Sequence, residues 1–212
     1  MSARGDAHID WVDITGAVLL ALATVATAWS GYQASRWNGE QAKAAARANA
    51  ARIESARAAG LANAQTQVDV ATFIAWVDAY AHHDARLTAF YSDRFRAEFK
   101  PAVDAWVATK PLKNRHAPLT PFAMPQYRLA EQTKSNLLQE DAEQGAARAR
   151  AYVQRSTNYV LGVVLFAAAL FFAGMSAKLP SRRIRIVLLC LGVAVFVGSV
   201  AWIASSPVTV SV

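Results

Sequence analysis

The chain has 212 residues, of which 54% are hydrophobic and 17% are charged, and its formal net charge is +7 at pH 7. Cys190 is the single cysteine, which excludes an intramolecular disulfide. The mean hydropathy is only +0.17, because long apolar segments and a polar block share one chain. The sequence contains no low-complexity tract and no solenoid repeat.

Three apolar runs occupy residues 14–30, 159–177 and 184–204, and none has an ionised side chain in its interior. A helix of about 20 apolar residues is long enough to cross a hydrocarbon core of roughly 30 Å. The sequence therefore predicts an all-α integral membrane protein with three transmembrane helices. The polar block 31–158, between the first two spans, is expected to form an extramembrane helical bundle or stalk.

The first span follows a short N-terminal segment, residues 1–13, and we expect it to be retained as an anchor. The region before it has a net negative charge, whereas a cleaved signal peptide needs a positive one. Small residues form one stripe along this span, and such stripes let transmembrane helices approach closely. They are Ala17, Ala21, Thr24 and Ala28, with Thr27 beside them.

The second and third spans also contain small residues. Gly162 and Gly174 lie in the second span and Gly192 and Gly198 in the third, as further candidates for helix-packing or pore-facing positions. The packing could be within one chain or between chains; three spans bury little of one another, so we favour a homo-oligomer or a partner membrane subunit. Aromatic residues are expected to anchor the spans at the membrane interfaces. They are Trp11, Trp29, Tyr32, Trp37, Tyr159 and Trp202.

Within the polar block, the Ala-rich residues 33–64 predict a helix with a bend at Gly60. Apolar residues then recur mainly at three- and four-residue spacing over residues 70–106, which indicates an amphipathic helix. Asp84 interrupts this stripe, and Pro101 either opens a new helical segment or kinks the helix. Prolines mark a tip loop at residues 110–125. Polar residues 126–158 predict a second long helix, which should pair antiparallel with the first.

Asp78, His82 and His83 are weak candidate metal ligands, and of these Asp78 and His82, four residues apart, share a helix face and could hold one metal ion. A third ligand is missing nearby, so we favour a solvated face and expect no metal and no cofactor. The sequence has no nucleophile elbow, phosphate loop or dinucleotide motif, and we therefore expect a protein that is not an enzyme. It also has no nucleic-acid-binding module, so no nucleic-acid partner is expected.

The segment 178–183, between the second and third spans, is a short basic loop, and short loops determine topology more strongly than long ones. Its cations and the one just beyond it are Lys178, Arg182, Arg183 and Arg185. We expect this loop and the N-terminus in the cytoplasm, and the block 31–158 and the tail 205–212 outside. The cations at the two ends of the block favour the opposite orientation. They are Arg36, Lys43, Arg47, Arg148, Arg150 and Arg155.

Segments 29–42, 121–127 and 158–166 read WSGYQASRWNGEQA, PFAMPQY and NYVLGVVLF. They resemble an uncharacterised family of bacterial inner-membrane proteins of unknown function. The resemblance implies the same three-span plan and a bacterial inner-membrane location. It implies no activity and no catalytic residues.

These features predict a membrane protein that self-associates or docks on a partner subunit as a scaffold, with membrane lipids around its spans. The alternative is a homo-oligomeric channel lined by the first span, with hydroxyls from Thr24, Thr27 and Ser30. The spans have no ionisable residue in their interiors, which disfavours a pump or an ion-coupled transporter.

Overall fold

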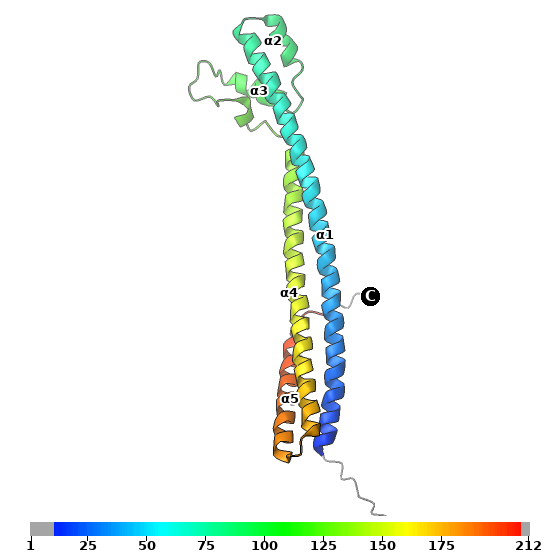
Figure 1. Ribbon diagram of the computed structural model, residues 1–212. Coiled ribbons are helices and arrows are strands. Elements are labelled where there is room, and N and C mark those ends of the chain that lie inside the picture. The colour runs from blue at the N-terminus through cyan, green and yellow to red at the C-terminus, as the bar shows by residue number, and fades with distance from the viewer. Residues whose placement is uncertain (1–10, 209–212) are drawn as a thin grey trace, which may run out of the picture. The chain divides into compact units, whose positions relative to one another are not determined.

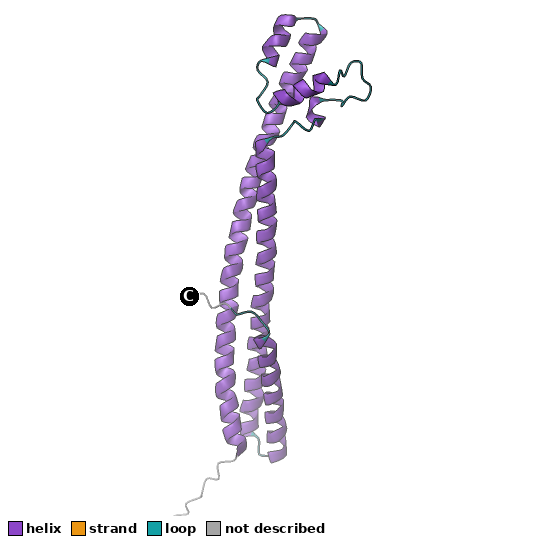
Figure 2. Ribbon diagram, turned by 180° about the vertical axis from the view of Figure 1, so that it is seen from behind, coloured by secondary structure: helices purple, strands orange, loops and turns teal. Residues whose placement is uncertain are grey.

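The computed structural model describes residues 11–208, and 82% of these residues are helical, with no strand among them. The elements, in chain order, are α1 (Trp11–Ala81), α2 (Ala85–Ser92), α3 (Lys100–Ala108), the 3-10 helix η1 (Pro121–Ala123), α4 (Ala130–Lys178) and α5 (Arg182–Ala204) (Figure 1). Figure 2 shows the same helices, joined only by loops. The predicted all-α class is thereby confirmed.

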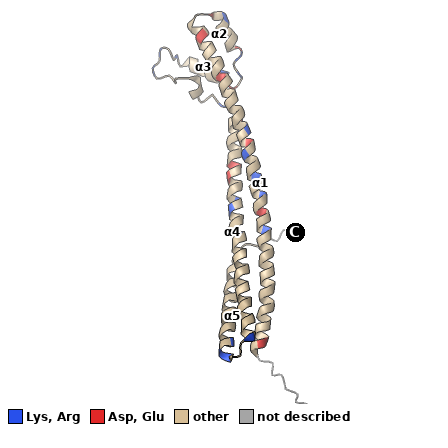
Figure 3. Ribbon diagram, in the orientation of Figure 1, with Lys and Arg blue, Asp and Glu red and all other residues tan. Residues whose placement is uncertain are grey.

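Three helices, α1, α4 and α5, are each long and apolar enough to cross a membrane. Each of these helices contains one of the three predicted spans. Figure 3 shows these segments free of charged residues between their ends, with acidic and basic residues at the start of α1 and where α4 meets α5. The chain is therefore compatible with a multi-pass membrane protein, as its composition predicts.

The chain divides into two compact units. The span unit comprises Met1–Ala46 and Gly145–Val212, and the aromatic unit comprises Arg47–Gln144. The divisions fall inside α1 and inside α4, so each of these helices contributes to both units.

In the span unit, α1, α4 and α5 pack around a small apolar core. Val12 and Leu19 of α1 meet Ala173 of α4 and Leu189 of α5, and all four are buried. A second cluster joins Ala34, Trp37 and Tyr159. Gly192 permits a close approach of α5 to its neighbours, because a Cβ there would lie 3.3 Å from both the Ala169 carbonyl oxygen and Leu19 Cδ2.

In the aromatic unit, the end of α1 and the segments that follow it bury a group of rings. Its buried members are Phe73, Phe95, Phe99 and Val103, and Trp76, Trp106, Phe122 and Tyr127 pack around them. Asp84 begins α2, because its side chain accepts a hydrogen bond from the Leu87 amide at 2.9 Å. Pro101 lies in the first turn of α3, where a missing amide hydrogen costs nothing.

Two elements differ from the predicted ones within their length. Helix α1 continues through Gly60 without a break, because good helix formers surround it and one glycine costs only about 1 kcal/mol. The predicted amphipathic helix over 70–106 is divided into the end of α1, α2 and α3. The first break lies at His83, which adopts φ 57°, followed by the capping residue Asp84.

The remaining differences concern element ends. The second long helix begins at Ala130 rather than at residue 126, and the proline-rich tip contains the short helix η1. The connection between α4 and α5 covers only residues 179–181, so its cations lie on the helix ends. Parts of the predicted N-terminal segment 1–13 and of the tail 205–212 lie outside the described residues.

Candidate functional site

The predicted stripe on the first span lies on the outer side of α1. We call Ala17, Ala21, Thr24 and Ala28 the α1 small-residue face, and all four are exposed. At 100° per residue they occupy the side of the helix roughly opposite Val12 and Leu19, which enter the core. The face is therefore free of contacts with α4 and α5 and available to lipid or to another chain.

The hydroxyls of this region bond mainly to their own helix. Thr24 Oγ1 donates to the Leu20 carbonyl oxygen at 2.7 Å, and Thr27 Oγ1 donates to that of Ala23 at 2.7 Å. Ser30 is completely buried and faces α4, since its Oγ lies 3.6 Å from the position of a Cβ at Gly162. Thr24 is thus the exposed member of the three.

The candidate glycines fall into two kinds. Gly162 and Gly192 are buried between helices, and a Cβ at Gly162 would overlap Ile203 Cδ1 of α5. A Cβ at Gly174 or Gly198 would have no described atom of another segment within 4 Å, and Gly198 is exposed. Only the first pair is used for packing within the span unit.

The candidate interface aromatics fall into an exposed group and a buried group. Trp11, Trp29, Tyr32 and Trp202 are about half exposed, as an interfacial position requires. Trp37 and Tyr159 are buried against one another's helices instead. The Trp37 ring lies 5.4 Å from that of Tyr152 and 4.6 Å from the Arg155 guanidinium carbon, while Tyr159 Oη donates to the Pro207 carbonyl oxygen at 3.2 Å.

The basic residues at the α4–α5 connection have different surroundings. Lys178, Arg182 and Arg183 are exposed. Arg185 is only 18% exposed: its Nε donates to the Ser176 carbonyl oxygen at 3.0 Å, and its guanidinium pairs with Asp13 of α1. Arg185 therefore joins all three spanning helices at one end.

Asp78, His82 and His83 do not form a metal site. His82 Nδ1 lies 3.5 Å from Asp78 Oδ1, but both side chains are about three-quarters exposed. His83 follows the end of α1 in a left-handed conformation. Among the described residues no group of three or more His, Cys, Asp or Glu side chains could hold a metal ion.

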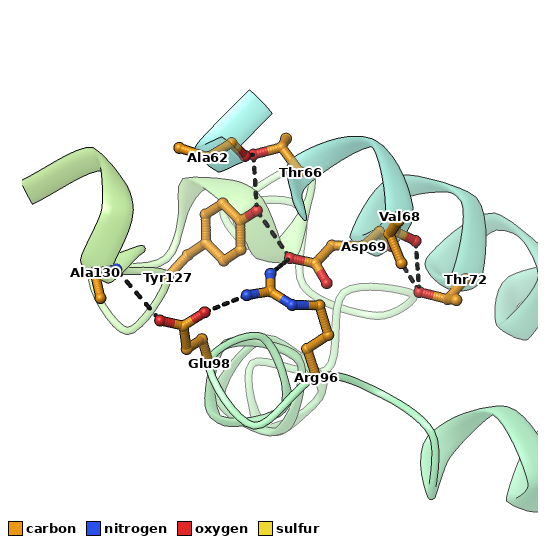
Figure 4. Close-up of polar contacts among 9 residues, drawn as sticks. All are labelled: Ala62, Thr66, Val68, Asp69, Thr72, Arg96, Glu98, Tyr127 and Ala130. Atoms are coloured by element: carbon orange, nitrogen blue, oxygen red, sulfur yellow. Dashed lines mark hydrogen bonds and ion pairs between the residues drawn. The ribbon is translucent and has the colours of Figure 1, made fainter. Parts of the chain in front are cut away.

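The structure also contains a buried polar network that the sequence pattern does not indicate (Figure 4). Asp69 of α1 is completely buried. Arg96 Nη1 donates to its Oδ2 at 2.9 Å, and Tyr127 Oη lies 3.1 Å from the same oxygen. Arg96 also pairs with Glu98, whose Oε1 accepts a hydrogen bond from the Ala130 amide at 3.3 Å.

This network joins three separate segments of the aromatic unit: α1, the turn before α3 and the start of α4. Burial raises the pKa of the Asp69 carboxyl above its ordinary value, while the Arg96 guanidinium opposes the rise. Burial likewise raises the pKa of the Tyr127 hydroxyl. The network stabilises this arrangement of segments through Asp69 Oδ2, whereas the buried Oδ1 of the same carboxylate has no hydrogen-bond partner among the described residues.

The α1 small-residue face is one surface of the span unit that remains open to a partner, besides exposed apolar residues of α4 and α5 such as Phe171 and Val187. It has no nucleophile or acid–base pair, and its only polar side chain, Thr24, donates to its own backbone. Comparisons of the chain with protein-family models, curated proteins and solved structures find no match.

Proposed function

We propose that the protein is a non-enzymatic scaffold of the bacterial inner membrane that self-associates, or docks on a partner subunit, through the α1 small-residue face. The observation that carries the proposal is the exposure of Ala17, Ala21, Thr24 and Ala28 on the side of α1 away from its own core. A second helix fits against such a face, because no long side chain holds the two backbones apart.

The spacing of these residues supports the same proposal. They follow one another at intervals of four, three and four, which is the heptad interval of helices that cross at about 20°. The adjacent exposed positions are large, with Val18, Leu22 and Val25 each more than half exposed. The small residues thus form a flat strip beside larger ones, against which a second helix packs.

In this proposal, the aromatic unit and the adjoining polar helix segments lie outside the hydrocarbon core and present the scaffold's interaction surface. The exposed cations Lys178, Arg182 and Arg183 favour a cytoplasmic α4–α5 connection. This orientation places the aromatic unit on the other side of the membrane, where its folded surface is available to extracytoplasmic partners.

Cysteine cross-linking in native membranes tests the proposal, with Cys190→Ser as the background because Cys190 is exposed. Ala21→Cys and Leu22→Cys are a matched pair, since both positions are exposed and they differ by about 100° around the helix. We expect an oxidant to link Ala21→Cys chains into dimers and to leave Leu22→Cys chains unlinked.

Equal cross-linking at the two positions would contradict a specific face. A particle that is strictly monomeric in lipid nanodiscs, with no co-purified subunit, would overturn the proposal altogether. Loss of the Ala21→Cys dimer on adding Ala17→Leu and Ala28→Leu would support it, because these side chains separate the helices.

A homo-oligomeric channel lined by α1 is a second proposal, favoured by the position of Thr24 on the same face. Thr24 would then supply a hydroxyl acceptor to the pore, whereas Ser30 is buried within its own chain. Planar-bilayer recording decides this question. We expect conductance that changes in Thr24→Val, and an absence of conductance over a range of voltages and ions would exclude the channel.

A further inference from the structure

The aromatic unit contains a groove of about 440 Å³ that none of the preceding arguments use. We call it the aromatic–lysine groove. One wall comes from the end of α1, the other from α3 and the loop that follows it. It is lined by Trp76, Val77, Tyr80, Trp106, Val107, Lys110, Pro111, Leu112 and Lys113.

The aromatic walls of this groove are held in place by packing on the core beneath. The rings of Trp76 and Tyr80 are stacked with centroids 5.6 Å apart, and Phe73 meets Trp106 edge to face at 5.4 Å. Trp106 Nε1 donates to the Pro118 carbonyl oxygen at 2.7 Å. The indole nitrogen of Trp106 is thus already used, and its apolar ring surface is what the groove offers.

The loop that follows α3 forms a tight turn in the second wall, and this turn carries two lysines. Lys110 adopts φ 54°, and its carbonyl oxygen accepts hydrogen bonds from the amides of Lys113 and Asn114, each at 2.9 Å. Thr109 Oγ1 donates to the Trp106 carbonyl oxygen at 2.6 Å. The backbone of the turn is therefore ordered before any ligand binds, which lowers the entropy cost of binding.

The positive charge of the groove favours an anionic ligand. Lys110 and Lys113 both line it, and no acidic side chain does. Both lysines are exposed, so their ammonium groups can reach a ligand at the mouth while the rings contact its apolar part. A pocket of this volume, apolar with a few polar groups, is typical of small-molecule sites.

We propose that the aromatic–lysine groove binds a small amphiphilic carboxylate. The apolar body of the ligand lies against Trp76, Tyr80 and Trp106, and its carboxylate pairs with Lys110 and Lys113. This proposal concerns the aromatic unit alone and does not depend on self-association through α1.

Calorimetric titration of the full chain in zwitterionic nanodiscs tests the proposal, with empty nanodiscs subtracted. The probe is 4-phenylbutanoate. Its neutral amide removes the charge, and butanoate removes the ring. We expect saturable binding of 4-phenylbutanoate, with both analogues weaker by about tenfold or more. Equal affinity for the amide would overturn the role of the lysines, and no saturable binding would overturn the site.

Two pairs of variants locate the binding. Lys113→Glu reverses a charge in the groove, and Arg115→Glu makes the same change two residues along the loop, at an exposed position outside it. Val77→Trp fills the groove, and Val70→Trp adds the same bulk to an exposed position of α1 outside the groove. We expect about tenfold weaker binding in the first member of each pair and unchanged binding in the second. Equal loss within a pair would contradict the proposed position.

Discussion

Arg96 Nη1 lies 2.9 Å from Oδ2 of Asp69, a carboxylate that is completely buried in α1. The pair joins residues far apart in the chain and brings the turn before α3 onto the end of α1. Tyr127 adds a third segment to the same oxygen. The arrangement of the aromatic unit therefore depends on one buried charge and its partners as well as on its rings.

Replacing Arg96 with alanine should destabilise the aromatic unit by about 3 kcal/mol, because it leaves the Asp69 carboxylate buried without its cation. Arg94→Ala is the matched control. Arg94 is exposed, and its guanidinium lies over the Phe90 ring at 3.6 Å, a contact worth about 1 kcal/mol or less. Near-UV circular dichroism during urea unfolding reports on the packed aromatic side chains, Trp76 and Trp106 among them, and measures the difference. Equal destabilisation by the two variants would contradict the importance of the pair.

The pKa of Asp69 predicts a pH dependence with a definite sign. Because burial raises its folded-state pKa above the ordinary value of 3.8, the folded state binds more protons than the unfolded state in that range. The contribution of Asp69 to stability is thus fully present below pH 3.8 and is lost as the pH rises through the folded-state value.

The variant Asp69→Asn isolates this contribution. The pH-dependent contributions of the other titrating groups cancel when the stability of this variant is subtracted from that of the native chain. The free energy of unfolding of the native chain, minus that of Asp69→Asn, should fall as the pH rises above about 3.8. Urea unfolding at a series of pH values provides both quantities. A difference that grows with pH would show that Arg96 outweighs burial and that the pKa is lowered instead.

The sequence predicts the helical class and the presence of three long apolar helices, because both follow from local composition. It does not indicate the Asp69 network, since Asp69, Arg96 and Tyr127 come from distant segments and each looks like an ordinary surface residue. The one local signal is that Thr66, Asp69 and Phe73 recur at three- and four-residue spacing. That signal places Asp69 on the same face as a core ring.

The spacing of apolar residues also could not determine which side chains of the predicted stripe are buried. Val70 and Phe73 both belong to the stripe, and the sequence predicts that both face the core. In the structure Phe73 is 9% exposed and Val70 is 36% exposed. The stripe is wider than the surface that α3 and the tip cover, so its edge remains in solvent.

These two positions give a direct test of the aromatic core. Phe73→Asp should destabilise the aromatic unit by at least about 3 kcal/mol, because it removes a ring that contacts Trp76, Phe99 and Trp106 and buries a charge. Val70→Asp should cost less than about 1 kcal/mol, since its side chain can reach water. Limited proteolysis of the aromatic unit, at matched temperature, distinguishes the two. Similar protection of both variants would mean that the rings contribute little to stability.

Gly192 and Gly198 of α5 provide the corresponding test for the span unit. A Cβ at Gly192 lies 3.3 Å from the Ala169 carbonyl oxygen and 3.4 Å from Phe172 Cβ, neither of which can move without shifting α4. Gly192→Val should therefore separate the helices and destabilise the unit by about 2 kcal/mol. Gly198→Val introduces the same residue into the same helix, where no described atom of another segment lies within 4 Å of its Cβ, and should be nearly neutral. Thermal unfolding in one detergent measures both. An equal loss of stability in the two variants would mean that the close contact of Gly192 with α4 is unimportant.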